Sequence, residues 1–207
     1  RGSVADEIEK AGLKGIRCRI HAGGEQIRVL VPIPGYHMVM NALAATAVGL
    51  SMGMTLEEIA RGIGKLEAIS GRFHIIEKNG YTVIDDCYNA NPVSMKASLQ
   101  VLETALGRKV AILGDMGELG ENEQALHEEV GRFAAGLDID KCICVGPLAG
   151  HLADAILASG ADMEIVKEES LEKTLEDLPQ LLREGYQMLR KSSHFMHFEK
   201  IVEALTK

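Results

Sequence analysis

The sequence has few basic residues for its size. Its 22 Lys and Arg residues stand against 30 Asp and Glu residues, which gives a formal net charge of −8 over 207 residues. A general nucleic-acid-binding protein normally presents a basic face, so this charge balance argues against that class. It does not argue against small anionic ligands, because a few local cations or helix N-termini can hold those.

Long apolar stretches are also missing. No run approaches the roughly 20 residues that a membrane-spanning helix needs, and no charged-then-apolar signal segment opens the chain. We therefore expect a cytoplasmic protein with no membrane partner. The composition, 46% hydrophobic and 25% charged, is that of an ordinary globular protein, and the length allows one large domain or two modest ones.

The few cysteines (Cys18, Cys87, Cys142 and Cys144) do not form the paired framework of a disulfide-rich protein. Cys142 and Cys144 belong to the string KCICVG, in which strand alternation would place both on one face. Metal binding would need further ligands at suitable spacing, and the sequence offers none. We expect buried, reduced thiols and no metal site.

The first part of the chain lacks a regular alternation of strand and helix. Gly15 to Pro34 is predicted to be a hairpin, because alternating apolar residues flank a Gly23-Gly24 turn. Pro32 and Pro34 would end it, since proline cannot donate to a strand ladder. A frayed helix is expected over Val4 to Ala11.

Two helices are predicted to follow the hairpin. The string HMVMNALAATAVGLSMGM is apolar nearly all round, as in a helix packed on several sides. A capping box at Thr55 starts the second helix, which runs to about Ile63. His37 and Asn41 lie one turn apart and share a face. They could make capping or core hydrogen bonds, or they could contact a ligand.

After a domain boundary near Ser70, strands and helices alternate regularly. The strand cores VAIL and CICV lack polar alternation, as expected for strands covered on both faces. Repeated β-α units predict an α/β fold with a doubly wound, mostly parallel, Rossmann-like sheet. The predicted strands are Tyr81–Asp86, Lys109–Met116, Lys141–Gly146, Met163–Val166 and Gln187–Lys191. The predicted helices are Pro92–Leu106, Glu121–Ala135, Leu148–Ser159, Leu171–Glu184 and Met196–Leu205.

The stretch from Tyr81 to Leu106 is the most informative. A β-favouring run ends in two carboxylates, Asp85 and Asp86, and Asn91-Pro92 then provides an N-cap and a first helical residue. Such a strand–loop–helix unit places side chains at the carboxyl edge of a parallel sheet, where α/β folds bind ligands. Alternation points the two carboxylates to opposite faces. Either could accept from ribose hydroxyls, orient an Arg, hold a metal, or serve only in an ion pair or a cap.

A glycine-punctuated loop, Gly114 to Gly120, could present backbone N–H groups to an anion. It is not a P-loop, because the Lys-Ser/Thr pair is missing, and no G-x-G-x-x-G follows a strand. His194 and His197 lie one turn apart near a helix start, where a surface or substrate-facing role is favoured over metal binding. Spacing alone identifies no nucleophile–base pair, since such groups meet only in space.

Four strings resemble the Mur ligase family over nearly the whole chain: PGYHMVMNALAATAVG, GRFHIIEKNGYTVIDDCYNANPVSMKASLQVL, AILGDMGELGENEQALHEEVG and KSSHFMHFEKIVEAL. The rare strings DDCYNANP and LGDMGELG are most similar to the member that joins D-alanyl-D-alanine to UDP-N-acetylmuramoyl-tripeptide. The resemblance implies an ATP- and Mg²⁺-dependent amide ligase of peptidoglycan precursor synthesis. In such enzymes ATP converts the tripeptide carboxylate to an acyl phosphate, which the dipeptide amine attacks.

The resemblance also implies a domain organisation. Residues 1–70 would be the C-terminal part of the central ATP-binding domain, and residues 71–207 the C-terminal domain. The family's UDP-sugar domain, P-loop and central-domain magnesium ligands are not in this sequence. We therefore expect a fragment of a larger ligase that has no catalytic residue of its own and is inactive alone. Its first part should expose apolar surface through which it could self-associate.

Individual roles follow from the same resemblance. Asn41 would contact adenine with His37 beside it, Arg72 would reach the ATP phosphates, and Asp86 would bind the ribose with Tyr88 next to it. The residues implied near the incoming dipeptide are Asn89, Asn91, Lys191, Ser193 and His194. Two positions depart from the family pattern. His194 replaces an Arg, which makes it a weaker and pH-dependent cation, and Met38 replaces an Asn.

Two other functions fit less well. A receiver domain of two-component signalling also has an acidic pair after its first strand and a Lys after its fifth. Its phosphorylated Asp must end the third strand, however, and that strand ends here in Gly146-Pro147. A folate polyglutamylating ligase of the same family would share the Arg and Asp positions, but it is not expected to combine YNANP with GDMGELG.

Overall fold

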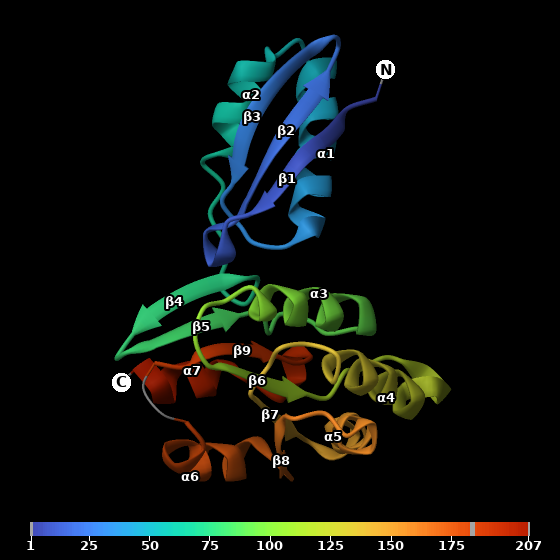
Figure 1. The fold of residues 1–207 in the computed structure, drawn as a ribbon, viewed down its shortest axis with the longest axis vertical. Helices are drawn as coiled ribbons and strands as arrows, with labels where there is room; N and C mark the ends of the chain where they lie inside the picture. The colour runs from blue at the N-terminus through green and yellow to red at the C-terminus, as the bar shows by residue number, and fades with distance from the viewer. Residues whose placement is uncertain (1, 183–184, 207) are drawn as a thin grey trace. The chain divides into compact units, whose positions relative to one another are not determined.

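The computed structural model describes residues 2–182 and 185–206. The chain divides into two compact units, Arg1–Ala68 (unit 1) and Ile69–Lys207 (unit 2) (Figure 1). The division lies next to Ser70, where the sequence predicts a domain boundary.

Unit 1 contains a three-stranded antiparallel sheet in the order β1-β2-β3. Its strands are β1 (Val4–Lys10), β2 (Ile16–Ala22) and β3 (Glu25–Val31), with a short 3-10 turn, η1 (Gly12–Lys14), after the first. The predicted hairpin is confirmed, and Gly23 and Gly24 at its turn both have positive φ. Ile16, Cys18 and Ile20 point into the core, so alternation in β2 sets which face of the sheet is buried.

The predicted helix over Val4 to Ala11 is wrong, because most of this segment forms β1 and pairs with β2. An isolated helix this short is marginal in water, whereas β2 offers an open row of backbone donors and acceptors. The register shifts between Asp6 and Glu9, and Glu7 has a φ of 46° in this bulge. Pairing with the edge of β2, and not local helix propensity, therefore decides the structure of this segment.

Two helices cover one face of the sheet: α1 (Tyr36–Ser51) and α2 (Leu56–Ile63). The predicted capping box is present, with Thr55 Oγ1 accepting from the Glu58 N–H at 3.2 Å and Glu58 Oε2 accepting from the Thr55 N–H at 2.9 Å. The helices cross closely at Gly49, where an added Cβ would lie 2.7 Å from Ile59 Cγ1.

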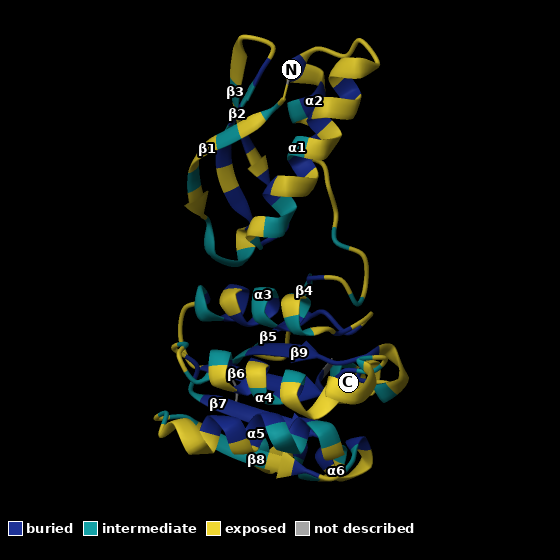
Figure 2. Ribbon diagram, turned by 90° about the vertical axis from the view of Figure 1, so that its right-hand side faces the viewer, coloured by how far each residue is buried: buried dark blue, intermediate teal, exposed yellow. Residues whose placement is uncertain are grey.

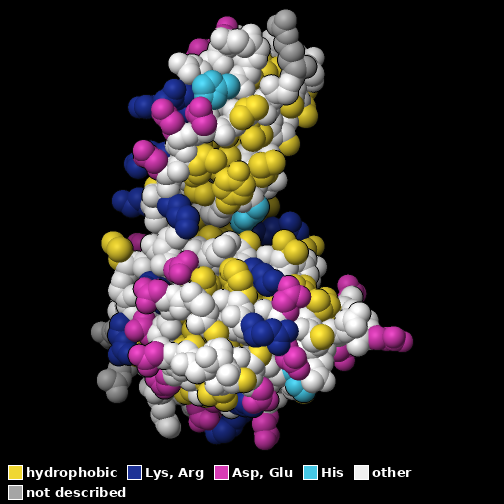
Figure 3. Space-filling model, turned by 45° about the vertical axis from the view of Figure 1, so that its right-hand side comes forward, with side chains coloured by type: hydrophobic (Ala, Val, Ile, Leu, Met, Phe, Trp, Pro, Cys, Tyr) yellow, Lys and Arg dark blue, Asp and Glu magenta, His cyan; other side chains and the backbone are white. Residues whose placement is uncertain are grey.

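Helix α1 differs from the prediction that it packs on several sides. Its buried residues are Val39, Ala42, Thr46 and Gly49, which occupy one face. The opposite face is exposed and apolar, with Tyr36, Met40 and Val48 61%, 53% and 58% exposed. Figure 3 shows apolar side chains gathered on one face of unit 1. Within unit 1, therefore, α1 has a packing partner on one side.

Unit 2 is built on a six-stranded sheet in the order β4-β5-β9-β6-β7-β8. The five predicted strands are confirmed and pair in parallel. A further strand, β4, pairs antiparallel with β5 through a turn at Asn79-Gly80, whose φ values are 52° and 76°. Figure 2 shows β9, β6 and β7 as largely buried. The strands are β4 (His74–Lys78), β5 (Tyr81–Asp85), β6 (Lys109–Gly114), β7 (Lys141–Val145), β8 (Glu164–Glu168) and β9 (Gln187–Lys191).

Helices cover both faces of this sheet. Because crossovers are right-handed, α3, α4 and α5 share one face, while the return from β8 to β9 places α6 and then α7 on the other. The helices are α3 (Pro92–Glu103), α4 (Glu123–Ala134), α5 (Pro147–Ser159), α6 (Leu171–Leu181) and α7 (Glu199–Thr206), with 3-10 turns η2 (Gly120–Asn122) and η3 (His194–Met196). The helix predicted over Leu171–Glu184 ends at Leu181, and its last two positions lie outside the described residues.

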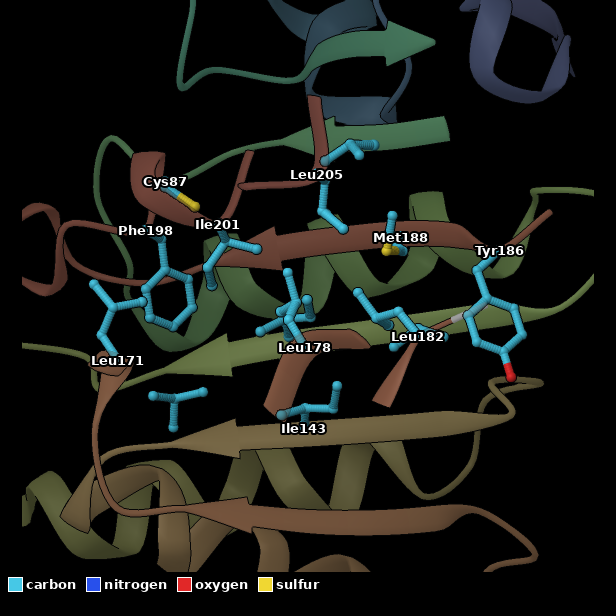
Figure 4. Packing of buried hydrophobic residues seen from close by; sticks show 14 residues of the cluster. Cys87, Ile143, Leu171, Leu178, Leu182, Tyr186, Met188, Phe198, Ile201 and Leu205 are labelled. Carbon is cyan, nitrogen blue, oxygen red and sulfur yellow. The ribbon is translucent and has the colours of Figure 1, made fainter. Parts of the chain in front are cut away.

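The core between the sheet and α6 and α7 is a continuous apolar layer (Figure 4). It includes Ile143 and Met188 from the strands and Leu178, Phe198 and Ile201 from the helical side. Packing in this layer fixes the position of β9, and of the segment that follows it, relative to α6 and α7. In the described part of the chain, no helix combines the length and the apolar character that a membrane span requires.

The predicted state of the cysteines is confirmed: all four are free and buried. Cys142 and Cys144 share a face of β7, with their sulfurs 3.5 Å apart. Burial raises the pKa of Cys87 to about 12, so this thiol stays protonated and donates to the Arg190 carbonyl oxygen.

Candidate functional site

The candidate site lies at the carboxyl edge of the unit 2 sheet, where the ends of β5, β9 and β6 are neighbours. The connections after β5 and β6 lead to α3 and α4 on one face, whereas the connection after β9 leads to α7 on the other. Ligands of α/β sheets bind where the connections of adjacent strands diverge in this way.

The two carboxylates that end β5 point to opposite faces, as predicted. On the α7 side, Asp85 Oδ1 lies 2.7 Å from Arg190 Nη2, and Arg190 Nη1 donates to the Phe198 carbonyl oxygen. On the α3 side, Asp86 Oδ2 lies 2.7 Å from Lys191 Nζ and accepts from Ser98 Oγ at 2.6 Å. The Asp85 contact is an ion pair without an aligned N–H, since Oδ1 accepts no hydrogen bond from the described residues. Both acids therefore have buried cationic partners.

Lys191 is among the most deeply buried side chains, with 2% exposed. Besides the Asp86 carboxylate, its Nζ donates to the Asn89 carbonyl oxygen at 2.9 Å and to the Asp86 carbonyl oxygen at 3.2 Å. An ammonium group has three N–H donors, and these contacts occupy all of them. Lys191 consequently anchors the loop after β5 to the end of β9.

The side chains of the two asparagines in that loop accept hydrogen bonds from nearby backbone N–H groups. Asn91 caps α3: its Oδ1 accepts from the Ser94 N–H at 2.9 Å, and Ser94 Oγ accepts from the Asn91 N–H at 3.1 Å. Asn89 Oδ1 accepts from the Ala90 N–H at 2.8 Å. Both residues are exposed beside the ends of the strands, and neither amide N–H₂ group takes part in these hydrogen bonds.

Arg72, Tyr88 and His194 form an exposed row on the same edge. The Arg72 guanidinium lies 3.9 Å from the Tyr88 ring centroid, a cation–π contact. The Tyr88 and His194 ring centroids are 6.1 Å apart, and those of His194 and His197 are 6.3 Å apart. The structure thus brings together three residues that the sequence proposes for ligand binding, although they are far apart in the chain.

The glycine-punctuated loop after β6 is held by two side chains. The Met116 N–H donates to His127 Nε2 at 2.9 Å, and His127 Nδ1 lies 2.7 Å from the Glu123 carbonyl oxygen, so the ring is neutral with its proton on Nδ1. The Gly117 N–H donates to Ser193 Oγ at 2.8 Å. Sequence reasoning missed His127, and no motif marks it.

Asp115, at the end of β6, caps α5. Its Oδ1 accepts from the Ala149 N–H at 2.7 Å, which places a carboxylate on the first turn of that helix. Burial raises the pKa of Asp115, while this hydrogen bond opposes the change. Gly146 makes room for the carboxylate: its φ is 107°, and a Cβ there would lie 2.6 Å from Asp115 Oδ1.

In unit 1, His37 and Asn41 lie in the first turns of α1. Asn41 is exposed, and its Nδ2 makes a weak contact of 3.5 Å with Met38 Sδ. The half-buried His37 ring packs on Gly35, where a Cβ would lie 2.4 Å from His37 Cε1. The Asn41 amide is therefore accessible to a ligand.

A family model described as "Mur ligase, glutamate ligase domain" matches residues 71–194. The UDP-N-acetylmuramoyl-tripeptide–D-alanyl-D-alanine ligase of Escherichia coli (strain K12) is 41% identical over 62% of this chain and 29% of its own length. A crystal structure of MurF from Acinetobacter baumannii superposes with a TM-score of 0.88 at 33% identity, over 99% of this chain and 45% of that one.

A Thermotoga maritima MurF structure in complex with ADP gives a TM-score of 0.79 at 26% identity, over 98% of this chain and 45% of that one. A folylpolyglutamate synthase from the same organism reaches 0.60 at 19% identity, over 91% and 44%, which is a likeness of fold alone. The folate-ligase alternative is therefore not favoured. The chain spans less than half the length of these relatives.

Proposed function

The chain belongs to the Mur ligase family, and from this premise we propose that it is part of an ATP-dependent ligase that joins D-alanyl-D-alanine to UDP-N-acetylmuramoyl-tripeptide in peptidoglycan precursor synthesis. The observation that carries the proposal is the match to relatives of that name, one of them 33% identical over 94% of this chain. The complex of a related structure with ADP supports the use of a nucleotide. Such a precursor ligase would work in the cytoplasm.

In this reaction the tripeptide carboxylate attacks the γ-phosphorus of ATP, which releases ADP and leaves an acyl phosphate. The dipeptide amine then attacks the acyl carbon, and inorganic phosphate leaves as the amide forms. The protein must neutralise phosphate charge, align the reactants and keep water out. The full enzyme is proposed to use Mg²⁺. Among the described residues, no group of three or more His, Cys, Asp or Glu side chains could hold a metal, so no step here is assigned to one.

We propose that Arg72 binds the ATP phosphates. Stacking on Tyr88 uses the face of the guanidinium and leaves its in-plane N–H groups for phosphate oxygens. Asp86 would accept from ribose hydroxyls, since Lys191 and Ser98 both donate to its Oδ2 and leave Oδ1 for a ligand. His37 and Asn41 would contact the adenine, for which the exposed Asn41 amide offers both a donor and an acceptor.

For the incoming dipeptide, we propose contacts from Asn89, Asn91, Ser193 and His194. The Ser193 hydroxyl accepts from the Gly117 N–H and can still donate its own proton. His194 is exposed and would add positive charge when protonated. Lys191 would support this group through the Asn89 loop and not as a free cation, because its donors are already used.

The proposal is tested by joining this chain to the preceding part of the Acinetobacter baumannii ligase, in place of the matching segment. With ATP, D-alanyl-D-alanine and UDP-N-acetylmuramoyl-tripeptide, the chimera should form the ligated product. Arg72→Met should lower the rate at least tenfold, as expected for a lost charge-assisted hydrogen bond, whereas Glu77→Gln, on the exposed side of β4, should not. A folded chimera without ligation would contradict the proposal. We also propose that the 207-residue chain is inactive by itself, and ligation by that chain alone would contradict this.

A further inference from the structure

Asp85 is a buried carboxylate for which the proposed function has no use. Its side chain is 3% exposed, like that of its partner Arg190. Its second oxygen, Oδ2, accepts a hydrogen bond from the Gly71 backbone N–H at 3.0 Å. The ion pair with Arg190 thus holds one oxygen of Asp85, while the other holds the chain just before Arg72.

Gly71 is fixed at both of its backbone groups. Its N–H donates to Asp85, and its carbonyl oxygen accepts from the Tyr88 N–H at 2.9 Å. Gly71 has a φ of 78°, and Phe73, on the other side of Arg72, has a φ of 52°. Two left-handed residues around one position define a tight, specific path for the chain. The direction in which the Arg72 side chain leaves the backbone depends on that path.

The Arg72 side chain ends on the ring of Tyr88, the residue whose N–H holds Gly71. The same loop therefore fixes both the backbone before Arg72 and the guanidinium itself. We propose that Asp85, held by Arg190, is a positioning residue that aims Arg72 at the phosphates of the nucleotide. This inference rests on the proposed role of Arg72 in binding ATP. The two neighbouring acids then have different roles: Asp86 would contact the ligand, and Asp85 would set the direction of the Arg72 guanidinium.

The test compares two probes, ATP and adenosine, titrated into the 207-residue chain and followed by NMR chemical shifts. The ratio of their affinities isolates the phosphate contacts, because adenosine has none. A purely structural loss would weaken both ligands together and leave the ratio unchanged. Arg72→Met should reduce the preference for ATP by about tenfold, as expected for one charge-assisted hydrogen bond to an anion.

A matched pair of double variants then isolates the Gly71 hydrogen bond. Both carry Arg190→Met, so neither leaves a buried unpaired cation, which would be costly. Asp85→Leu removes the acceptor for the Gly71 N–H, whereas Asp85→Asn keeps one oxygen. We expect the Leu variant to lose most of the preference for ATP and the Asn variant to keep it. Glu77→Gln, an exposed charge change on β4, is the further control.

The outcomes separate this inference from the proposed function. If wild type shows no preference for ATP, or Arg72→Met keeps it, the phosphate role of Arg72 fails and the inference with it. If Arg72→Met loses the preference but the Leu variant keeps it, the function stands and the positioning role is overturned. Loss of the preference for ATP in both double variants would show that the hydrogen bond from Asp85 to Gly71 does not position Arg72. Should the Leu variant not fold by circular dichroism, the double variant Asp85→Ser with Arg190→Met, whose serine is too short to reach Gly71, must show the same loss.

Discussion

The charged side chains at the carboxyl edge of the unit 2 sheet are largely committed to one another. Asp85 with Arg190 and Asp86 with Lys191 are buried pairs, and each cation also donates to backbone carbonyl oxygens. Removing one member of such a pair leaves an uncompensated buried charge, which is why single substitutions here mix function with folding. Among the exposed side chains at this edge, Arg72, Tyr88 and His194 are outside these buried pairs and remain accessible to a ligand.

Asp115 should give the protein a pH dependence opposite in sign to that of most carboxylates. Burial raises its pKa in the folded state, so the folded protein binds its proton more tightly than the unfolded chain does. Its contribution to stability is full below the ordinary Asp pKa and is lost as pH rises through the raised folded pKa. The difference in unfolding free energy between wild type and Asp115→Asn, measured by urea denaturation, should fall over that range. A flat or rising difference would contradict this.

Gly146 should be less replaceable than a glycine whose surroundings are open. Gly146→Ala combines a φ of 107° with a Cβ that would lie 2.6 Å from Asp115 Oδ1, whereas Gly160 has a φ of 70° and nothing within 4 Å of its added Cβ. Positive φ alone costs an alanine about 1–2 kcal/mol. Gly146→Ala should therefore lose clearly more unfolding free energy in urea than Gly160→Ala. Equal losses would show that the Asp115 cap moves aside freely.

At the residue scale, the sequence could name the strand-end acids but not their partners. Lys191 is 105 positions from Asp86, and Ser193 is 76 from Gly117, so only the fold brings them together. The resemblance to a family proposed Arg72, Tyr88 and His194, and the structure places them in one row. No sequence pattern indicates that Asp85 accepts from the Gly71 N–H or that His127 accepts from the Met116 N–H.

Among the elements, helix α3 depends on a cap that the sequence predicts. Asn91→Ala removes the acceptor for the Ser94 N–H and should lower the free energy of unfolding by about 1 kcal/mol. Asn91→Asp keeps an oxygen in that position and should retain most of the stability. Urea denaturation of both variants checks this, and an equal loss in the two would mean that the amide, and not the cap, stabilises the loop.

Helices and strands with a clear pattern of apolar residues were predictable from the sequence, whereas strands that form only because a neighbouring strand pairs with them were not. The strand and helix alternation of unit 2 follows from the apolar runs VAIL and CICV and from capped helix starts. Strand β1 was missed because its pattern is weak and its pairing depends on the free edge of β2. Strand β4 was also missed, although its Asn79-Gly80 turn is a hairpin signal that could have identified it.

At the scale of the whole molecule, the two units differ in how completely they cover their apolar surface. Unit 2 encloses its parallel strands between helices on both faces. In unit 1, the 16-residue α1 contains no Asp, Glu, Lys or Arg and leaves one apolar face open. An exposed apolar patch on a water-facing surface favours association. The resemblance described in the sequence analysis leads to the same expectation of exposed apolar surface in this unit.

We therefore expect the 207-residue chain to self-associate through α1 as its concentration rises. Size-exclusion chromatography with light scattering should show a mass above that of the monomer at high concentration. The double variant Met40→Glu and Val48→Glu should shift the chain towards monomer, because it places two charges on the exposed face. Lys10→Gln with Lys14→Gln changes the net charge equally on another surface and should not. A clean monomer at high concentration, or an equal effect of both double variants, would show that α1 does not mediate association.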